Sequence, residues 1–324
     1  IISLASLPDF DPNHRPNLPS RSSAAESPLF NKAIQGVYEL GSTFKIFTVA
    51  QALELGLVDP KTKINTKGPI RIGGHKINDY RSNGPELPVW EVITESSNLG
   101  TARIAKMIGP EKQREFLSSL GFSKPTTIEM IEANGGKPLL PKRWNELETM
   151  TISYGHGLSA TPLHLATGYA TLANGGRLVN PTLLQEVKPV LGPRVISKEV
   201  AENSLAMLRG VVTGGTASLA DVDGYFVGGK TGTADKPSSQ GGYDKEKNIT
   251  NFASIFPINE PEYVLVVTLD EAQDTSGPEP KRTAGWTAVP VSAEIIARVA
   301  PLLGLRPKFD NHSTIGITLS NWQE

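Results

Sequence analysis

Apolar residues between Gly41 and Gly56 recur at the interval of an α-helix. The residues at relative positions i, i+3, i+4 and i+7 are Ile46, Val49, Ala50 and Leu53. This spacing places them on one side of a helix, which buries that side against the rest of the protein. The pattern therefore predicts an amphipathic helix that begins close to residue 42 and ends before Gly56.

The same signals predict further helices over residues 89–120, 161–175, 197–214 and 284–303. Within the first of these ranges, Asn98–Gly100 and Gly109-Pro110 interrupt the helical period. Thr161-Pro162 combines an N-cap with a proline at the first helical position, which is a strong helix start. The last range is predicted to be helical although it contains Pro290 and Pro301.

Extended segments follow the helical ones. Residues 224–233, 249–256 and 263–269 have the composition of strands, joined by a Gly/Ser/Lys-rich loop over 235–248 and a tight turn over 259–261. Connections this direct favour an antiparallel sheet. Residues 1–7 form a further candidate strand, followed by a surface loop over 8–27. The pattern predicts a sheet built from both chain ends, with a helical region inserted between them.

Composition narrows the possible functions. The chain has 324 residues, enough for one large domain or two smaller ones with a substantial core. Its 32 basic and 33 acidic side chains nearly cancel, so no nucleic acid is predicted as a partner. Cysteine is absent, which excludes a thiol nucleophile or a thiolate metal site. The apolar run at 263–269 is far shorter than the roughly 20 residues that a membrane helix needs.

Ser42 and Lys45 fall at the start of the first predicted helix. A serine hydroxyl is a weak nucleophile and needs a neighbouring base, and a lysine three residues later lies about one helical turn away. Taken alone, this Ser-x-x-Lys motif is most simply a solvated helix start.

Two other short motifs change that interpretation. Ser96-Ser97-Asn98 falls at a predicted helix junction, where such residues usually cap the backbone. Lys230-Thr231-Gly232 lies in a predicted strand next to Gly228 and Gly229, and glycines inside a strand usually mark the close approach of a ligand or another backbone. The occurrence of all three motifs in one order predicts an acyl-transfer site.

These three motifs resemble the signatures of penicillin-binding proteins and serine β-lactamases. Four flanking segments, 36–41, 154–162, 173–176 and 215–217, resemble the class B penicillin-binding proteins, which are monofunctional transpeptidases. The resemblance extends over residues 1–303. At position 98, where elongation-type enzymes commonly carry aspartate, Asn98 resembles the division-type enzymes of the penicillin-binding protein 3 group.

The resemblance implies a fold and a domain organisation. The implied fold is α/β (α+β), with an antiparallel sheet flanked by helices and an inserted all-helical subdomain over roughly 60–160. The transpeptidase domain would cover residues 1–303, and residues 304–324 would form a C-terminal tail. Class B enzymes carry an N-terminal membrane anchor and pedestal, which this chain lacks. The resemblance therefore implies a module of a longer protein at the periplasmic face of the bacterial inner membrane.

The resemblance also assigns catalytic roles. Ser42 would attack the penultimate D-Ala carbonyl of a peptidoglycan stem peptide, and Lys45 would accept the serine proton. That role requires a neutral amine, although a free lysine has a pKa of about 10.4. Burial and the charge of Lys230 would lower it. Ser96 would relay protons between the lysines and the leaving amine.

Binding roles are implied in the same way. Asn98 would hydrogen-bond the substrate backbone, and Lys230, Thr231 and Thr233 would bind its carboxylate. Gly232, with Gly228 and Gly229, would let the substrate lie against the strand. The backbone N–H groups of Ser42 and Thr233 would form the oxyanion hole.

Partners and cofactors complete the expectations. The implied partners are stem peptides, β-lactam inhibitors and, through the missing N-terminal part, divisome membrane proteins and a glycosyltransferase. The implied setting is septal cell-wall synthesis. The five histidines form no metal-binding spacing, so no metal or cofactor is predicted, and His156 is expected to be structural.

Three alternatives share these motifs. A serine β-lactamase must hydrolyse its acyl-enzyme rapidly, and no glutamate in the sequence is identified that would activate water for that step. A β-lactam sensor domain uses acylation as a signal, and a D,D-carboxypeptidase uses water as acceptor. The class B flanking segments argue against the carboxypeptidase.

Overall fold

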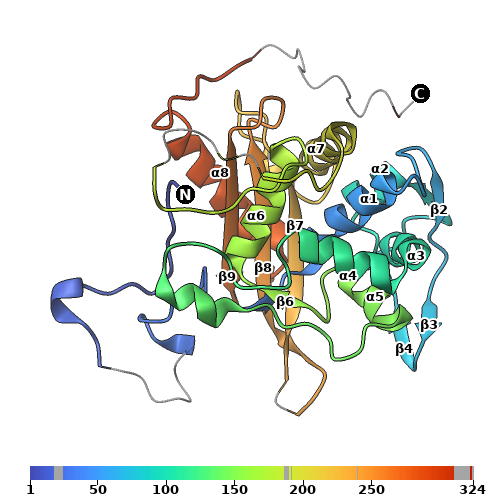
Figure 1. The fold of residues 1–324 in the computed structure, drawn as a ribbon, viewed down its shortest axis with the longest axis horizontal. Helices are drawn as coiled ribbons and strands as arrows, with labels where there is room; N and C mark the ends of the chain where they lie inside the picture. The colour runs from blue at the N-terminus through green and yellow to red at the C-terminus, as the bar shows by residue number, and fades with distance from the viewer. Residues whose placement is uncertain (18–24, 186–189, 191, 239, 310–321, 323–324) are drawn as a thin grey trace.

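The computed structural model describes residues 1–17, 25–185, 190, 192–238, 240–309 and 322. Its central element is an antiparallel sheet with the strand order β7-β8-β9 (Figure 1). The strands are β7 (Gly228–Pro237), β8 (Tyr243–Phe256) and β9 (Tyr263–Asp270). The three predicted strands and their antiparallel pairing are confirmed. β7 lies at the edge of this sheet, and within the described residues it pairs on one side only, with β8.

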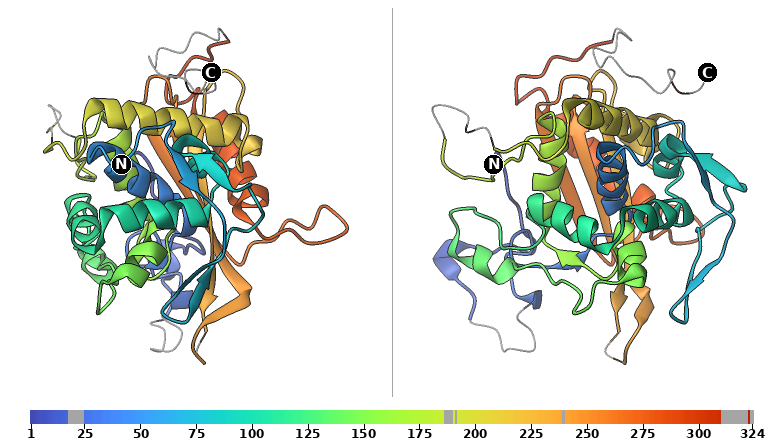
Figure 2. Two further views of the ribbon diagram at one scale, coloured as in Figure 1. Left: turned by 90° about the vertical axis from the view of Figure 1, so that its right-hand side faces the viewer. Right: turned by 45° about the vertical axis from the view of Figure 1, so that its right-hand side comes forward.

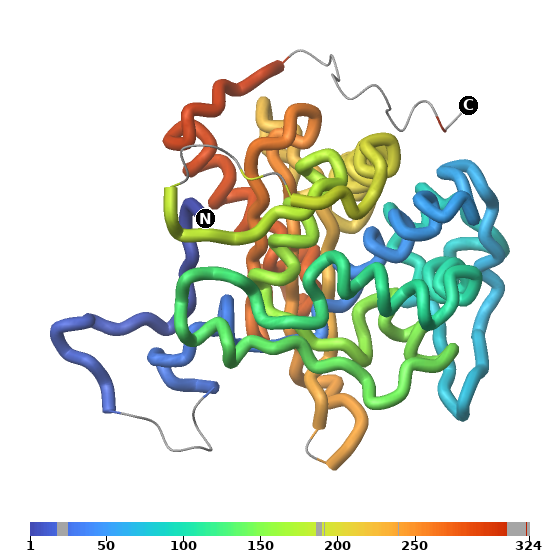
Figure 3. The backbone as a smooth tube through the Cα atoms, viewed as in Figure 1, coloured from blue at the N-terminus to red at the C-terminus, as the bar shows by residue number. Residues whose placement is uncertain are grey.

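The β7–β8 hairpin is longer than predicted. Residues 235–248 were expected to form a loop, but pairing resumes after an irregularity between Asp235 and Lys236 and continues to Pro237 opposite Tyr243. This ribbon extends beyond the body of the protein (Figure 3). Because both faces of such a ribbon meet solvent, its polar residues carry no alternation that would reveal a strand.

Three helices pack around the sheet, and they are α6 (Pro162–Ala173), α7 (Lys198–Thr213) and α8 (Ala288–Val299). α8 covers one face and α6 lies on the opposite face (Figure 2). Thr161 caps α6 by accepting a hydrogen bond from the His164 N–H, as the Thr-Pro sequence predicts. The predicted helix over 284–303 is shorter in the structure, because Ala284–Trp286 forms a 3-10 turn.

Residues 45–153 contain the remaining helices, on one side of the sheet (Figure 1). They are α1 (Lys45–Glu54), α2 (Val89–Thr94), α3 (Asn98–Ile108), α4 (Pro110–Ser119) and α5 (Glu146–Ser153). Two antiparallel strand pairs lie among them: β2 (Lys63–Asn65) with β5 (Glu86–Pro88), and β3 (Ile70–Ile72) with β4 (His75–Ile77). The expectation of an all-helical insert over 60–160 is therefore wrong, because strands of three residues are too short to show a period in the sequence.

An aromatic cluster joins the helical region to the sheet. Phe44 and Phe47, at the start of α1, pack on Phe122 with ring centroids 4.9 Å and 5.4 Å away, respectively. Tyr169 of α6 packs edge-on against Phe47 and donates a 3.0 Å hydrogen bond to the carbonyl of Thr43. All four rings are buried, so the beginning of α1 is fixed from both sides.

The N-terminal segment differs from its prediction. Residues 1–7 form no strand, and Ile2 and Leu7 are exposed. The first strand is β1 (Tyr38–Glu39), which pairs with β6 (Ser159–Ala160) and not with the central sheet. The three central strands all follow residue 227, so the expected sheet from both chain ends is also wrong. An apolar run indicates a strand only where a partner edge is available.

Most of the predicted C-terminal tail lies outside the described residues. Within the described part of the chain, no helix has both the length and the apolar character that crossing a membrane requires.

Candidate active site

Ser42 lies in the 3-10 turn Gly41–Phe44 that leads into α1. Gly41 has a φ of +58°, and a Cβ there would be 2.9 Å from the carbonyl oxygen of Thr233 in β7. The N–H of Gly41 donates a 3.2 Å hydrogen bond to the carbonyl of Gly155. The turn is therefore held between the edge of the sheet and the 155–157 segment, in a backbone conformation that favours glycine.

Lys45 follows one turn later, as the motif predicts. Its N–H donates to the Ser42 carbonyl, and its side chain is fully buried. Its Nζ donates to the carbonyl of Ser96 and, over 3.0 Å, to the Ser96 hydroxyl. The Ser42 side chain is partly exposed, and within the described residues its hydroxyl makes no hydrogen bond. The amine of Lys45 is thus anchored on Ser96 and not on Ser42.

Ser96 lies in the short turn between α2 and α3. It has a positive φ of 58°, which is uncommon for a residue with a side chain and marks a backbone constrained by its surroundings. Lys230 of β7 donates a 2.9 Å hydrogen bond from Nζ to the same Ser96 hydroxyl that Lys45 contacts. One hydroxyl therefore lies between two buried amines, one from the helical region and one from the sheet.

Burial changes the acid–base behaviour of both lysines. The pKa of Lys45 is lowered well below its ordinary value, first by burial and then by the charge of Lys230, while Asp79 opposes this shift. Burial lowers the pKa of Lys230 to about 7. A protein interior disfavours two neighbouring ammonium groups, so at neutral pH a neutral amine is available beside Ser96.

Asp79 fixes the Ser96–Asn98 segment from behind. Its two carboxylate oxygens accept hydrogen bonds from the Ser97 hydroxyl at 2.7 Å and from the Leu99 N–H at 2.9 Å. The Asn98 side chain donates a 3.0 Å hydrogen bond to the carbonyl of Asn78 on the same loop. Sequence reasoning missed Asp79, because a single aspartate 17 residues before Ser96 belongs to no motif.

The third motif lies along β7 as predicted. The Thr231 hydroxyl is 2.7 Å from that of Thr216, and the Thr233 hydroxyl accepts a 3.0 Å hydrogen bond from the N–H of Ala284. A Cβ on Gly232 would overlap the carbonyl of Leu40, so this glycine allows the serine turn to reach the strand.

A polar cluster borders the site where Tyr243, at the turn end of the β7–β8 hairpin, meets Glu39 and the 154–157 segment. Glu39 accepts hydrogen bonds from the N–H of Gly157 at 2.7 Å and from the hydroxyl of Tyr243 at 3.0 Å. The ring of His156 packs between Tyr154 and Tyr243, and burial lowers its pKa. These contacts connect three chain segments beside Ser42.

Among the described residues, no three His, Asp or Glu side chains are arranged to hold a metal ion.

The structure therefore joins Lys45, Ser96 and Lys230 directly through hydrogen bonds. Thr231 is close to Lys230, with 3.5 Å between Oγ1 and Nζ. The Asn98 side chain donates to the carbonyl of Asn78, and the Thr233 hydroxyl accepts from the N–H of Ala284. Ser42 carries the partly exposed hydroxyl, just before the helix that begins with Lys45. A nucleophile of this kind beside buried amines can form and resolve an ester with a carbonyl substrate.

Comparison with known proteins gives one consistent family. Residues 1–296 match the family model described as the penicillin binding protein transpeptidase domain. The chain is 34% identical over 320 residues to a probable peptidoglycan D,D-transpeptidase FtsI of Caulobacter vibrioides, covering 95% of this chain and 53% of that protein. It is 31% identical over 309 residues to the peptidoglycan D,D-transpeptidase FtsI of Escherichia coli K12, covering 95% of this chain and 50% of that protein.

The chain spans about half the length of these curated relatives. Among solved structures, it resembles the apo structure of the TP domain of Burkholderia pseudomallei penicillin-binding protein 3. The two superpose with a TM-score of 0.78 at 34% identity, over 86% of this chain and 84% of that one. The fold described above, with its helices and antiparallel sheet, is thus shared with a solved relative.

Proposed function

This chain belongs to the family of penicillin-binding protein transpeptidase domains, and we propose that it is the catalytic domain of a division-type peptidoglycan D,D-transpeptidase. The observation that carries the proposal is the placement of the Ser96 hydroxyl between two buried lysine amines, 3.0 Å from Lys45 and 2.9 Å from Lys230. This arrangement provides a proton path beside the partly exposed hydroxyl of Ser42.

In the proposed acylation step, the Ser42 oxygen bonds to the penultimate D-Ala carbonyl carbon of a stem peptide. Lys45 takes the serine proton, and its buried position favours the neutral amine that this step requires. Ser96 passes a proton to the nitrogen of the terminal D-Ala as the peptide bond breaks, and Lys45 returns the serine proton to the Ser96 hydroxyl. The products are an ester on Ser42 and free D-Ala.

Substrate binding follows from the free edge of β7. A peptide can lie along this edge as an added strand, with its terminal carboxylate toward Lys230, Thr231 and Thr233. Packing of Gly41 on Thr233 supports a pairing of the backbone N–H groups of Ser42 and Thr233 as oxyanion donors. Asn98 would exchange its contact with Asn78 for the substrate backbone.

The biological setting is proposed from the relatives. Their names describe peptidoglycan D,D-transpeptidases, and Asn98 agrees with the division-type group. We therefore propose septal peptidoglycan cross-linking at the periplasmic face of the inner membrane, inhibited by β-lactams. Divisome proteins and a glycosyltransferase would be partners of the whole protein.

Intact mass spectrometry with a labelled penicillin tests this function. We expect one penicillin to add to the chain, and Ser42→Ala to abolish the addition. Ser119→Ala, at an exposed position in α4, is the control and should label normally. Labelling that persists in Ser42→Ala would end the proposal.

The lifetime of the adduct separates the alternatives. A transpeptidase should retain the penicillin ester for many minutes, because water is not activated for attack. Return to the free mass within seconds would instead identify a β-lactamase.

A further inference from the structure

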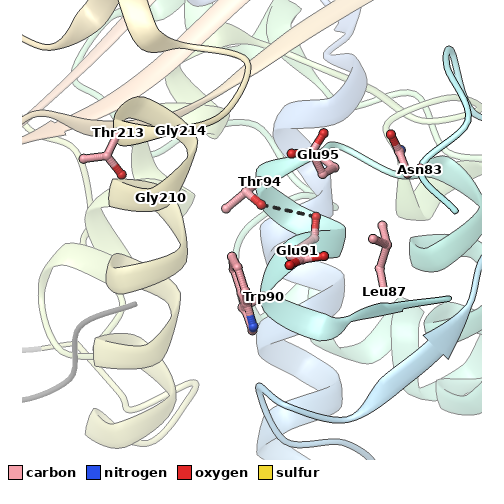
Figure 4. A pocket seen from close by; sticks show the side chains of 9 residues that line it. All are labelled: Asn83, Leu87, Trp90, Glu91, Thr94, Glu95, Gly210, Thr213 and Gly214. Atoms are coloured by element: carbon pink, nitrogen blue, oxygen red, sulfur yellow. Dashed lines mark hydrogen bonds between the residues drawn. The ribbon is translucent and has the colours of Figure 1, made fainter. Parts of the chain in front are cut away.

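A cleft of about 480 Å³ lies between α2 and the C-terminal end of α7 (Figure 4). Trp90, Glu91, Thr94 and Glu95 line one wall, and Thr213 and Gly214 belong to the opposite wall. The proposed mechanism uses none of these residues. The cleft combines an indole, two carboxylates and hydroxyl groups, which is the composition of a site for a polar ligand with an apolar part.

The cleft has a negative character. Glu91 and Glu95 lie one helical turn apart, and within the described residues neither carboxylate forms an ion pair or a side-chain hydrogen bond. No lysine or arginine is among the described residues that line the cleft. The pKa of Glu91 is raised, first by burial and then by the charge of Glu95. A bound cation would relieve this repulsion, and the Trp90 ring could pack against its alkyl part.

The cleft adjoins the catalytic centre. Glu95 immediately precedes Ser96, and a Cβ on Gly215 would be 2.6 Å from the carbonyl of Thr94. Thr216, next in sequence, is hydrogen-bonded to Thr231 at the proposed carboxylate-binding end of β7. The terminal D-Ala of the donor would occupy that end and leave from it. The acceptor must then reach the ester from the side that the leaving group has vacated.

We propose that this cleft binds the acceptor stem peptide through its ammonium group, with Glu91 and Glu95 as the anionic partners. The inference rests on the proposed transpeptidase function and identifies where its second substrate enters. The two substrates are then distinguished by charge: the buried lysines attract the carboxylate of the donor, and the acidic cleft attracts the amine of the acceptor.

The reaction balances as follows. The ammonium passes from the cleft to the adjoining ester, where it loses one proton to the neutral amine of Lys45 through the Ser96 hydroxyl. Its nitrogen forms a bond to the acyl carbon, and the bond between that carbon and the Ser42 oxygen breaks. The second proton of the attacking nitrogen passes to the Ser42 oxygen. The products are a new amide cross-link and the free serine, with one proton gained by the lysine.

Partitioning of the acyl-enzyme tests the proposal. The donor is a D-Ala-terminated thioester, and the acceptors are D-alanine amide, which carries an ammonium, and D-lactate amide, which carries a hydroxyl in its place. The measured quantity is the ratio of acceptor product to hydrolysis product. We expect Glu91→Gln/Glu95→Gln to lower this ratio for D-alanine amide by about tenfold, the effect of about 1.4 kcal/mol. The rate of thioester consumption and the ratio for D-lactate amide should change by less than about twofold, since neither requires the carboxylates.

A matched control and a second variant accompany this measurement. Glu111 and Glu115 are also one turn apart, on the exposed surface of α4, and their double replacement by glutamine should leave the ratio unchanged. Thr213→Lys adds a cation to the opposite wall, keeps both carboxylates, and should lower the ratio in the same direction.

The outcomes are separable. If both cleft variants form the ester normally and keep the wild-type ratio, the acceptor site is refuted while the transpeptidase function stands. Equal losses for D-alanine amide and D-lactate amide would also refute recognition of the ammonium. Failure of the unmodified chain to form an ester would remove the proposed function itself.

Discussion

Asp79 and Ser97 are joined by a 2.7 Å hydrogen bond, in which the serine hydroxyl donates to the carboxylate. The other carboxylate oxygen accepts from the N–H of Leu99, so Asp79 binds the residues on both sides of Asn98, directly after the turn at Ser96. Its charge also opposes the lowering of the Lys45 pKa. Asp79 is therefore a positioning residue with both a geometric and an electrostatic effect on the site.

Replacing Asp79 should separate these effects. We expect Asp79→Ala to slow acylation by penicillin roughly 10- to 100-fold, because a misplaced catalytic group is costly. Asp79→Asn retains an acceptor for Leu99 but removes the charge, so the pKa of Lys45 falls further and the acidic limb of the acylation pH profile moves to lower pH. Stopped-flow acylation rates across pH measure both. A purely structural role predicts slower acylation with an unmoved limb, and the exposed Asp9→Asn serves as control.

Lys230 should control the alkaline side of the profile. Its pKa of about 7 means that the ammonium is lost as the pH rises through neutrality. Acylation by a β-lactam with a free carboxylate should then weaken above about pH 7, because the carboxylate loses its cationic partner. The methyl ester of the same β-lactam should not show this decrease. The comparison of second-order acylation rates for acid and ester would contradict the role of Lys230 if both decline alike.

Burial of Lys230 should reduce stability. Its pKa is lowered from 10.5 to about 7, so the unfolded state binds the proton more tightly than the folded state. The resulting loss of unfolding free energy is largest below pH 7 and disappears as the pH approaches 10.5. We expect Lys230→Met to raise the free energy of unfolding by roughly 2–4 kcal/mol at pH 6, where the lysine proton costs most, and by less at pH 9. Urea denaturation at both pH values measures the difference, and a gain that does not depend on pH would point to packing instead.

Gly155 should be required for the serine turn. A side chain there would overlap the carbonyl of Gly41, next to Ser42, and its φ of +86° already disfavours any other residue. Gly109 has the same φ of +86° with open space around it, and is a matched control. We expect Gly109→Ala to cost about 1 kcal/mol of unfolding free energy and Gly155→Ala about 2–4 kcal/mol.

The rate of acylation provides a second comparison of Gly155→Ala with Gly109→Ala. Gly155→Ala should also lower the acylation rate of the folded fraction, whereas Gly109→Ala should not. Equal effects of the two substitutions on both quantities would argue that only backbone strain matters.

The sequence predicted those parts of the fold that depend on local patterns. The period of α1, the cap at Thr161 and the strands β7 to β9 all carry their signal within a few residues. The short strands β2 to β5 and the extension of the β7–β8 hairpin depend on pairing between segments, which leaves little trace in either partner. Residues 1–7 show the opposite error, since their apolar character has no partner strand.

In the candidate site, too, the residues of local motifs could be predicted and those that act through distant contacts could not. Ser96 was expected to relay protons between the lysines and the leaving amine, and the structure joins Lys45, Ser96 and Lys230 by hydrogen bonds. The supporting residues Asp79, Glu39 and Thr216 contribute through contacts with distant segments, and no local spacing in the sequence identifies such contacts. The roles assigned to Ser42, Asn98 and Thr233 remain predictions for the experiments above.

The shared hydroxyl of Ser96 links the protonation of the catalytic lysines to the position of the helical region relative to the sheet. Lys45 and Ser96 belong to the helical region and contact each other, whereas Lys230 belongs to the sheet. A longer distance between Lys230 and Ser96 than the present 2.9 Å would weaken this contact, and the charge of Lys230 would then lower the pKa of Lys45 less. The distance between the helical region and the sheet therefore influences the protonation of the base through the charge of Lys230.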